Sequence, residues 1–123
     1  MSFVHCHTHT SSSTLDGVGR IEEYAELAKK YDMKSICITD HGNMSNVYNF
    51  YTTLKKHNLK AIIGCEFYLY NNYVFDDSYE LKVPTSHQIV LVKNKQGYIN
   101  ANKLNYDSFT KTFYRKPLIK RSE

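Results

Sequence analysis

The spacing of apolar residues along the chain predicts two amphipathic helices, over about residues 20–31 and 45–57. In the first, glutamates lie early and lysines late, an order that the helix dipole favours. The residues expected to face inward from the two helices are Ile21, Tyr24, Ala25, Ala28, Tyr31, Val47, Phe50, Tyr51 and Leu54.

Short apolar runs elsewhere in the chain predict buried strands. The expected strands are residues 2–8, 34–39, 61–64 and 88–93, with extended chain over 66–70. Residues 71–86 are polar and acidic, which favours a loop or hairpin, and residues 95–105 are typical of a third helix.

The alternation of strands and helices predicts an α/β fold with parallel strands. The 123 residues are enough for one domain with a modest core. We expect residues 1–106 to form the α/β body and residues 107–123 to form a basic C-terminal segment.

Half of the six histidines fall at positions 5, 7 and 9. A strand sends alternate side chains to one face, so this spacing predicts three neighbouring imidazoles. Imidazole is the commonest nitrogen ligand of metal ions in proteins, and the cluster therefore indicates the floor of a metal site. The alternative for His7 and His9 is a pair of buried, hydrogen-bonded histidines. Cys6 alternates with the histidines and is expected to face away from them.

Further polar residues fall where the predicted strands end. They are Asp16 after the first strand, Asp40 and His41 after the second, Glu66 after the third and His87 before the fourth. Groups at the carboxyl ends of parallel strands converge on one mouth, so these side chains can meet around one or more ions. Mixed imidazole and carboxylate ligation favours zinc, manganese or iron. Such ions activate water and hold phosphate, which is the chemistry of phosphoesterases.

The net charge of +4 is unevenly distributed. Residues 1–81 carry seven Lys and Arg against ten Asp and Glu, whereas residues 82–123 carry nine against two. A basic end beside an acidic body fits a phosphate-bearing partner such as a nucleic acid or nucleotide, and the alternative is a solvated tail. Three cysteines and the lack of a signal peptide or long apolar span favour a reducing cytoplasm and no membrane association.

Several ordered motifs resemble those of a known family. They lie at residues 5–10, 15–17, 38–44 and 63–68, and the likeness continues through 87–93, 97–100 and 113–117. In order and spacing they resemble the PHP (polymerase and histidinol phosphatase) domain, most of all the version at the N-terminus of bacterial DNA polymerase III alpha subunits. The resemblance covers nearly the whole chain.

This resemblance implies a distorted β/α barrel that holds up to two or three divalent ions. The implied metal ligands are His7, His9, Asp16, His41, Glu66 and His87. Active members of the family hydrolyse phosphoesters, and some polymerase versions act as 3′–5′ exonucleases on DNA. Other members have lost the metals and serve as structural support.

The chain also departs from the family pattern. The family's later strands supply three more ligands, whereas here no His or Cys follows His87 and Asp107 is the only later Asp. We therefore expect a partial, incomplete barrel, corresponding to about the first half of the family's domain. Its unpaired strand edge and apolar faces would need a cover, which predicts a homo-oligomer or a partner protein.

Four candidates have a second interpretation. Asp16 could simply shape a turn, and Glu66 could be a solvated acid instead of a bridging carboxylate. Asp40, a catalytic candidate, either caps the following helix or orients a ligand histidine. His5, the other catalytic candidate, is expected to support the ligands or face the substrate, or it is a plain structural histidine.

Two functions from different classes follow. The first is a metal-dependent phosphoesterase that acts on nucleic-acid ends or nucleotides in the cytoplasm of a bacterial cell or a phage-infected host. The alternative is a catalytically impaired PHP-like module that docks on a replicative polymerase or another partner, or sequesters a nucleotide. A third interpretation is a remnant of a split gene. A serine nucleophile at 11–13 is rejected, because the Gly-x-Ser-x-Gly elbow is missing.

Overall fold

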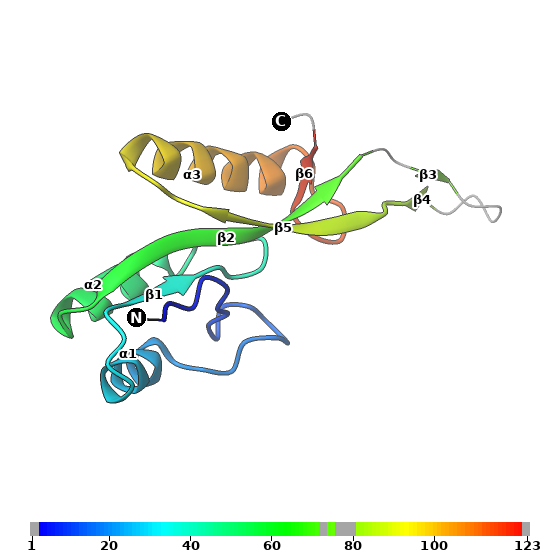
Figure 1. The fold of residues 1–123 in the computed structure, drawn as a ribbon. Coiled ribbons are helices and arrows are strands. Elements are labelled where there is room, and N and C mark those ends of the chain that lie inside the picture. Colours follow the sequence, from blue (N-terminus) through cyan, green and yellow to red (C-terminus); the bar gives the residue numbers. More distant parts are fainter. Residues whose placement is uncertain (1–2, 72–73, 76–80, 122–123) are drawn as a thin grey trace.

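The computed structural model describes residues 3–71, 74–75 and 81–121 (Figure 1). In chain order the elements are α1 (Ile21–Lys30), β1 (Ser35–Ile38), α2 (Val47–Lys56), β2 (Lys60–Tyr70), β3 (Val74–Phe75), β4 (Leu81–Lys82), β5 (Thr85–Leu91), α3 (Lys95–Thr110) and β6 (Leu118–Lys120). β3 and β4 pair with each other, apart from the main sheet.

The main sheet is built around β2, which pairs along both of its edges. One edge pairs first with β1 and, near its end, with β6, both in parallel. The other edge pairs with β5 in antiparallel register from Gly64 to Tyr70. After β1 ends, the chain forms one more isolated β-bridge with β2, between His41 and Glu66. This bridge lies between the parts of β2 that pair with β1 and with β6. Ligand sites favour such points, where neighbouring chains diverge from a common strand.

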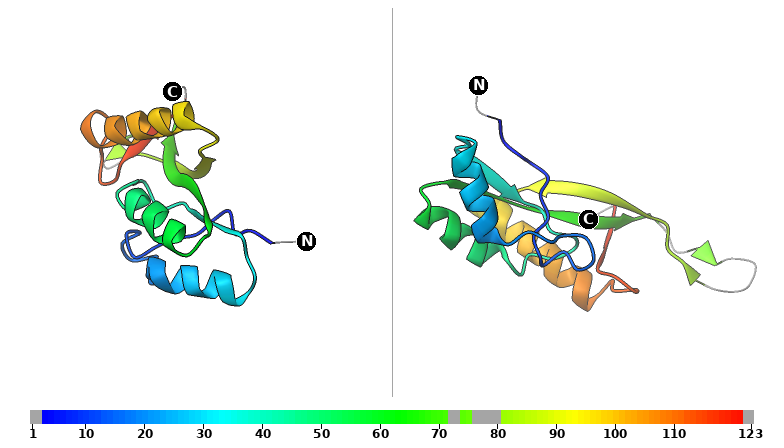
Figure 2. Two further views of the ribbon diagram at one scale, coloured as in Figure 1. Left: turned by 90° about the vertical axis from the view of Figure 1, so that its left-hand side faces the viewer. Right: turned by 90° about the horizontal axis from the view of Figure 1, so that it is seen from below.

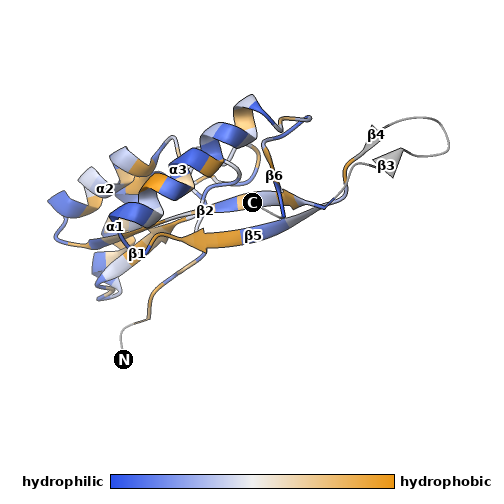
Figure 3. Cartoon of the chain, turned by 90° about the horizontal axis from the view of Figure 1, so that it is seen from above, coloured by the Kyte–Doolittle hydropathy of each residue, from blue (hydrophilic) through white to orange (hydrophobic). Residues whose placement is uncertain are grey.

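The three helices lie in a row along one side of the curved sheet (Figure 2). Hydrophobic residues concentrate on β1, β2 and the second half of β5, whereas the helices alternate hydrophobic and hydrophilic residues (Figure 3). None of the described helices is long and apolar enough to cross a membrane.

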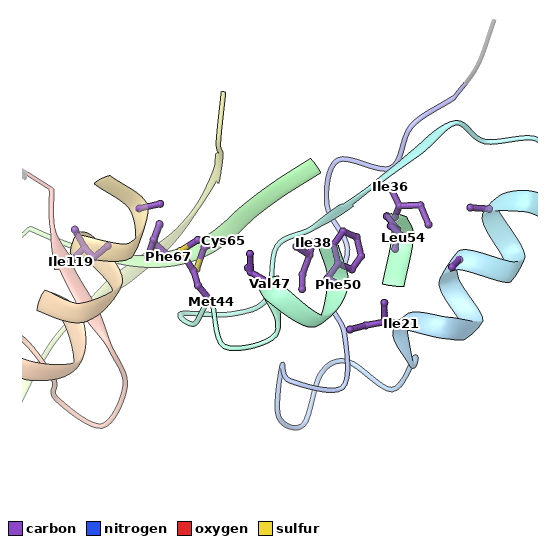
Figure 4. Close-up of a cluster of buried hydrophobic side chains, with 13 residues drawn as sticks. Ile21, Ile36, Ile38, Met44, Val47, Phe50, Leu54, Cys65, Phe67 and Ile119 are labelled. Carbon is purple, nitrogen blue, oxygen red and sulfur yellow. The ribbon is translucent and has the colours of Figure 1, made fainter. Parts of the chain in front are cut away.

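The core lies between this row of helices and the sheet (Figure 4). Its buried members include Ile21, Ala25, Ala28, Ile36, Ile38, Val47, Phe50, Leu54, Phe67 and Ile119. Most of the predicted inward residues are confirmed, but Tyr31 and Tyr51 are wrong, because they are 63% and 49% exposed. Each ring lies beneath the ammonium group of a lysine near the end of a helix. This cation–π contact forms at the surface, where the ammonium stays hydrated.

The helices α1 and α2 and the strands β1 and β2 lie where the apolar pattern predicted them. The expected strand over 61–64 and the extended chain over 66–70 are one strand, β2. The third helix, expected over 95–105, continues to Thr110, and β6 lies in the basic C-terminal segment. The hairpin expected in 71–86 is present as β3 and β4, although part of that range lies outside the described residues.

The expectation of a regular strand over 2–8 is wrong for the described residues 3–8. The Cys37 and Thr39 N–H groups donate to the carbonyls of His5 and Thr8. The two N–H groups are two residues apart along β1, but the carbonyls that accept from them are three residues apart. The N-terminal segment therefore contains one extra residue, which bulges out of the pairing. The Thr39 hydroxyl also accepts the Thr8 N–H. This segment follows β1 without forming a regular ladder.

The expectation of parallel strands throughout is also wrong. β1 and β6 run parallel to β2, but β5 runs antiparallel to it. The excursion through β3 and β4 returns the chain as a hairpin, without the crossover that a parallel strand would need. The result is a mixed α/β fold whose sheet, over the described residues, is open and not closed into a barrel.

Candidate metal centre

All six predicted metal ligands meet at the gap between β1 and β6. Their donor atoms form three overlapping groups in which all members lie within 4.8 Å of one another. The groups are His7, His9 and Glu66; His9, Asp16 and His41; and His41, Glu66 and His87. His9, His41 and Glu66 each belong to two groups, so the groups form one continuous cluster.

Glu66 is the centre of this cluster and is 4% exposed. Its Oε2 atom lies 2.6 Å from His7 Nε2 and 3.2 Å from His9 Nε2. Its Oε1 atom lies 3.0 Å from His87 Nδ1. Two ligands of a shared zinc ion, each about 2.1 Å from it, lie roughly 3–3.5 Å apart. The His9 and His87 separations fall in this range, whereas the shorter His7 separation is that of a direct hydrogen bond. The carboxylate is placed to bridge two positions.

The backbone fixes Glu66 beside His41. The Glu66 N–H donates to the Asp40 carbonyl at 3.1 Å, and the Gly42 N–H donates to the Glu66 carbonyl at 2.9 Å. The residues that leave β1 are thus held against the middle of β2.

His87 reaches the cluster because β5 is antiparallel to β2. In register, His87 stands opposite Tyr68, near the carboxyl end of β2. A parallel β5 would start at the other end of the sheet, so its first residues would lie far from the cluster. The sequence interpretation placed His87 correctly although it assumed the wrong strand direction.

Asp16 enters the cluster from the loop after residue 10. Its Oδ2 atom lies 3.0 Å from His41 Nε2 and 3.6 Å from His9 Nε2. Gly17 lets this loop fold back, since a Cβ atom there would lie 1.9 Å from the Thr10 carbonyl oxygen.

Asp40 lies behind the cluster, 1% exposed. Its carboxylate accepts hydrogen bonds from the Thr10 N–H at 2.6 Å, the Thr10 hydroxyl at 2.7 Å and the Ser13 hydroxyl at 3.0 Å. The N-cap of α2 is Asn46, so the alternative in which Asp40 caps that helix is wrong. The contacts favour the other alternative, because Ser13 in turn contacts His9.

The hydrogen bonds of Ser13 assign the tautomer of His9. The Ser13 hydroxyl has one hydrogen, which the acceptor-only Asp40 carboxylate takes, and its oxygen accepts the His41 N–H at 2.9 Å. His9 Nδ1, at 3.2 Å from the same oxygen, must therefore be the donor. In the neutral ring the Nε2 atom then has no hydrogen, and its lone pair points into the cluster.

The bare Nε2 of His9 tests whether a cation fits. It faces His7 Nε2 at 2.9 Å, Glu66 Oε2 at 3.2 Å and Asp16 Oδ2 at 3.6 Å. If His7 Nε2 carries a hydrogen, it can donate that hydrogen to only one neighbouring acceptor. The other nitrogen and oxygen lone pairs then face one another without a hydrogen between them. A divalent cation accepts from all of them, and this nitrogen and oxygen donor set suits zinc, manganese or iron.

The electrostatics also favour a neutral His9. Burial lowers the pKa of His9, and the neighbouring His41 lowers this pKa further, against opposing effects of Asp16 and Glu66. A neutral imidazole is the form that binds metal.

His5 lies apart from the metal-ligating groups. Its ring meets Phe3 edge to face at 4.6 Å. It lines a cavity of 460 Å³ that His7, His9 and Asp16 also line. The prediction that His5, His7 and His9 share one face is therefore only partly right, because the bulge after His5 breaks the alternation.

The cysteines also stay apart from the described metal-ligating groups. Cys6 is exposed, as expected of a side chain that faces away from the histidines. Burial raises the pKa of Cys37 and of Cys65 to about 12, so both thiols remain protonated at neutral pH.

Sequence reasoning missed three residues at the site. Ser13 was set aside within a serine run. Tyr68 stacks on His41 at 5.5 Å and meets His87 edge to face at 5.0 Å. Strand alternation could have found it, because Tyr68 lies two residues after Glu66 on the same strand. Lys116, over the Tyr68 ring at 4.3 Å, had no such signal.

The residues of the cluster lie between the N-terminal segment and β5, within the span that a family model matches. The model of the PHP domain matches residues 5–123. The chain belongs to the PHP domain family. Its six clustered residues lie in the motifs on which the sequence resemblance was based.

Curated relatives of this PHP domain are long polymerase chains. The DNA polymerase III subunit alpha of Helicobacter pylori is 38% identical over 122 residues, which are 98% of this chain and 10% of that protein. Those of Borreliella burgdorferi and Aquifex aeolicus are each 38% identical, over 98% and 95% of this chain and 11% of each protein. The chain therefore spans about a tenth of the length of the relatives it matches.

Proposed function

We propose that this PHP domain is a metal-dependent phosphoesterase whose two or three ions are held by His7, His9, Asp16, His41, Glu66 and His87. The observation that carries the proposal is the Ser13-assigned tautomer of His9, which directs a bare nitrogen at Glu66. Zinc, manganese and iron are the candidate ions, because they accept both nitrogen and carboxylate donors. When bound, such ions stabilise phosphate oxygens and ease proton removal from water.

The residues of the chain have distinct tasks in this proposal. The Glu66 carboxylate would be shared by two metal positions, because each of its oxygens faces a different histidine. Asp40 acts through Ser13 as a positioning residue, which keeps the His9 ring in its orientation and tautomer. His7 and His87, about half exposed, leave the cluster open to a substrate on that side.

Nucleic-acid ends or nucleotides are the proposed substrates. The basic C-terminal third supports a phosphate-bearing ligand, and the polymerase relatives favour nucleic acid among such ligands. His5 lies outside the three metal-ligating groups of the described residues but lines the same cavity as His7, His9 and Asp16, so we assign it at most a role toward a substrate in that cavity.

The test is metal binding and turnover in matched variants. Equilibrium dialysis with Mn²⁺ or Zn²⁺ should give two or three ions per chain. Hydrolysis of bis(nitrophenyl) phosphate should fall about 100-fold or more in His7→Ala and His41→Ala, whose folds should persist. His57→Ala removes a histidine at the end of α2, away from the cluster, and should leave both measurements unchanged. Unchanged metal binding in the first two variants would contradict the proposal.

A second candidate function rests on the open sheet and on the polymerase relatives. In it, the domain has no turnover and docks on a replicative polymerase or another partner, or sequesters a nucleotide. Metal-free protein that stays folded and has no turnover, yet binds a polymerase chain, would favour this candidate over the enzyme.

A further inference from the structure

A second cavity lies beside the metal centre, between the start of β5 and the turn that precedes β6. It measures 340 Å³, and its polar lining residues include Thr85, Arg115 and Lys116. The cavity therefore combines two cationic side chains with a hydroxyl.

Lys116 is a cation without a counter-charge. Its Nζ atom donates to Thr85 Oγ1 at 2.8 Å and lies 4.3 Å from the centre of the Tyr68 ring. Over the described part of the chain, no carboxylate lies within ion-pair distance of this ammonium. Thr85 Oγ1 accepts from Lys116, and its own hydrogen remains available to a ligand.

The position of Lys116 is fixed relative to the metal centre. Tyr68, beneath the ammonium, stacks on His41 and meets His87 edge to face. The next residue, Pro117, packs on Gly42, where an added Cβ would lie 2.7 Å from the proline Cγ. The turn before β6 is thus anchored directly to the corner that carries His41.

Arg115 adds a second, more exposed cation. It lies at the tip of the turn with φ 59, and the Tyr114 N–H closes the turn by donating to the Lys116 carbonyl at 3.2 Å. The Arg115 guanidinium lies 5.5 Å from the Tyr114 ring, and the side chain is exposed.

We propose that this cavity binds a second phosphate of the substrate, adjacent to the one held at the metal centre. The inference rests on the proposed function and narrows its substrate class to a nucleic-acid strand, which presents neighbouring phosphates, over a phosphomonoester, which presents one. Lys116 and Arg115 supply charge for the phosphate, and Thr85 supplies a hydrogen-bond donor.

The first test measures binding without turnover. A fluorescent thymidine tetranucleotide is titrated in EDTA at several salt concentrations, and anisotropy reports the Kd. Lys116→Gln should raise the Kd about tenfold and reduce the salt slope by about 0.7, the value for one lost phosphate contact on a single strand. Lys95→Gln, which removes one charge at the start of α3, is the matched control and should change neither quantity. Lys116→Arg should retain most of the affinity.

Equal losses in Lys116→Gln and Lys95→Gln would overturn the proposal, because they would indicate unspecific attraction. Failure of the unmodified protein to bind the tetranucleotide at low salt would also overturn it. Inorganic pyrophosphate that competes as well as the tetranucleotide would contradict a nucleic-acid strand as the ligand.

The second test separates this inference from the proposed function. With Mn²⁺ bound, Lys116→Gln should raise KM for the tetranucleotide about tenfold at unchanged kcat. The kcat/KM for bis(nitrophenyl) phosphate, which has one phosphate, should stay within about twofold. A purely structural role of Lys116 would lower both activities and overturn the proposal. If the unmodified protein hydrolyses neither substrate, the phosphoesterase proposal fails, whereas the binding measurement still decides the phosphate site.

Discussion

The two regions that form the metal centre hold their side chains in different ways. Residues 5–70 supply five of the six clustered side chains, and hydrogen bonds to Asp40 and Ser13, both 1% exposed, hold this side. Residues 85–120 supply His87, which has contacts to Glu66 and to the rings of His41 and Tyr68. A buried polar network fixes direction and tautomer, whereas ring contacts fix position less sharply.

This difference also appears in the packing. In residues 5–70 the polar network lies directly beside a core of large buried side chains such as Phe50 and Leu54. In contrast, α3 buries only Ala101 and Ser108 along its 16 residues, and Tyr98 and Phe109 are at least 40% exposed. We therefore expect residues 5–70 to determine the stability of the centre and residues 85–120 to adjust its access and its ligand.

The largest effect should come from Asp40→Ala. It leaves the Thr10 N–H and two hydroxyls buried without their acceptor, at a cost of about 3 kcal/mol or more in the free energy of unfolding. Urea unfolding followed by circular dichroism measures this cost. Glu26→Ala removes an exposed carboxylate from the middle of α1 and should leave the unfolding curve unchanged. A small loss in Asp40→Ala would mean that the polar network does not hold this region.

Ser13→Ala should weaken metal binding and should cost less in folding than Asp40→Ala, about 1–3 kcal/mol, because it leaves one N–H group, that of His41, without its acceptor. Without the hydroxyl, His9 loses the acceptor that fixes its tautomer, and such supporting contacts are worth 10–100-fold in metal affinity, so a loss of about that size is expected. Calorimetric titration with Zn²⁺ measures the affinity. Ser12→Ala removes the adjacent hydroxyl, for which the described residues provide no site contact, and is the matched control. Equal affinities in the two variants would exclude the proposed role of Ser13.

His87→Ala should weaken metal binding less than Ser13→Ala does. His87 belongs to one of the three groups, so the other two remain intact, and we expect a loss of about tenfold in the affinity of one ion. Counting ions by mass spectrometry of the native protein should show one weakened position. Loss of all ions would contradict the difference between the two regions, since it would make His87 as central as Glu66.

The sequence predicted the parts of this molecule that depend on local pattern. Helical spacing identified α1 and α2, and short apolar runs identified β1 and β2. The six metal-ligand candidates also meet as predicted, although their role as ligands stays a proposal. These features depend on nearby residues or on motifs.

Other features depend on contacts that no local pattern contains. The N-terminal segment is irregular because the Thr39 and Asp40 side chains take N–H groups that a ladder would use. The direction of β5 depends on the excursion before it, and Lys116 meets Tyr68 through the pairing of β6 with β2 and the packing of Pro117 on Gly42. Ser13 looked like part of a polar loop, because a serine run does not reveal which hydroxyl is buried.

The central claim is that His9 presents a bare Nε2 atom to a cation. Nitrogen-15 correlation spectroscopy of the histidine rings measures this directly, before and after addition of Zn²⁺. The account predicts that His9 carries its hydrogen on Nδ1 in the metal-free protein and that its Nε2 resonance shifts on binding. A hydrogen on Nε2, or a His9 spectrum unchanged at saturating Zn²⁺, would contradict the account.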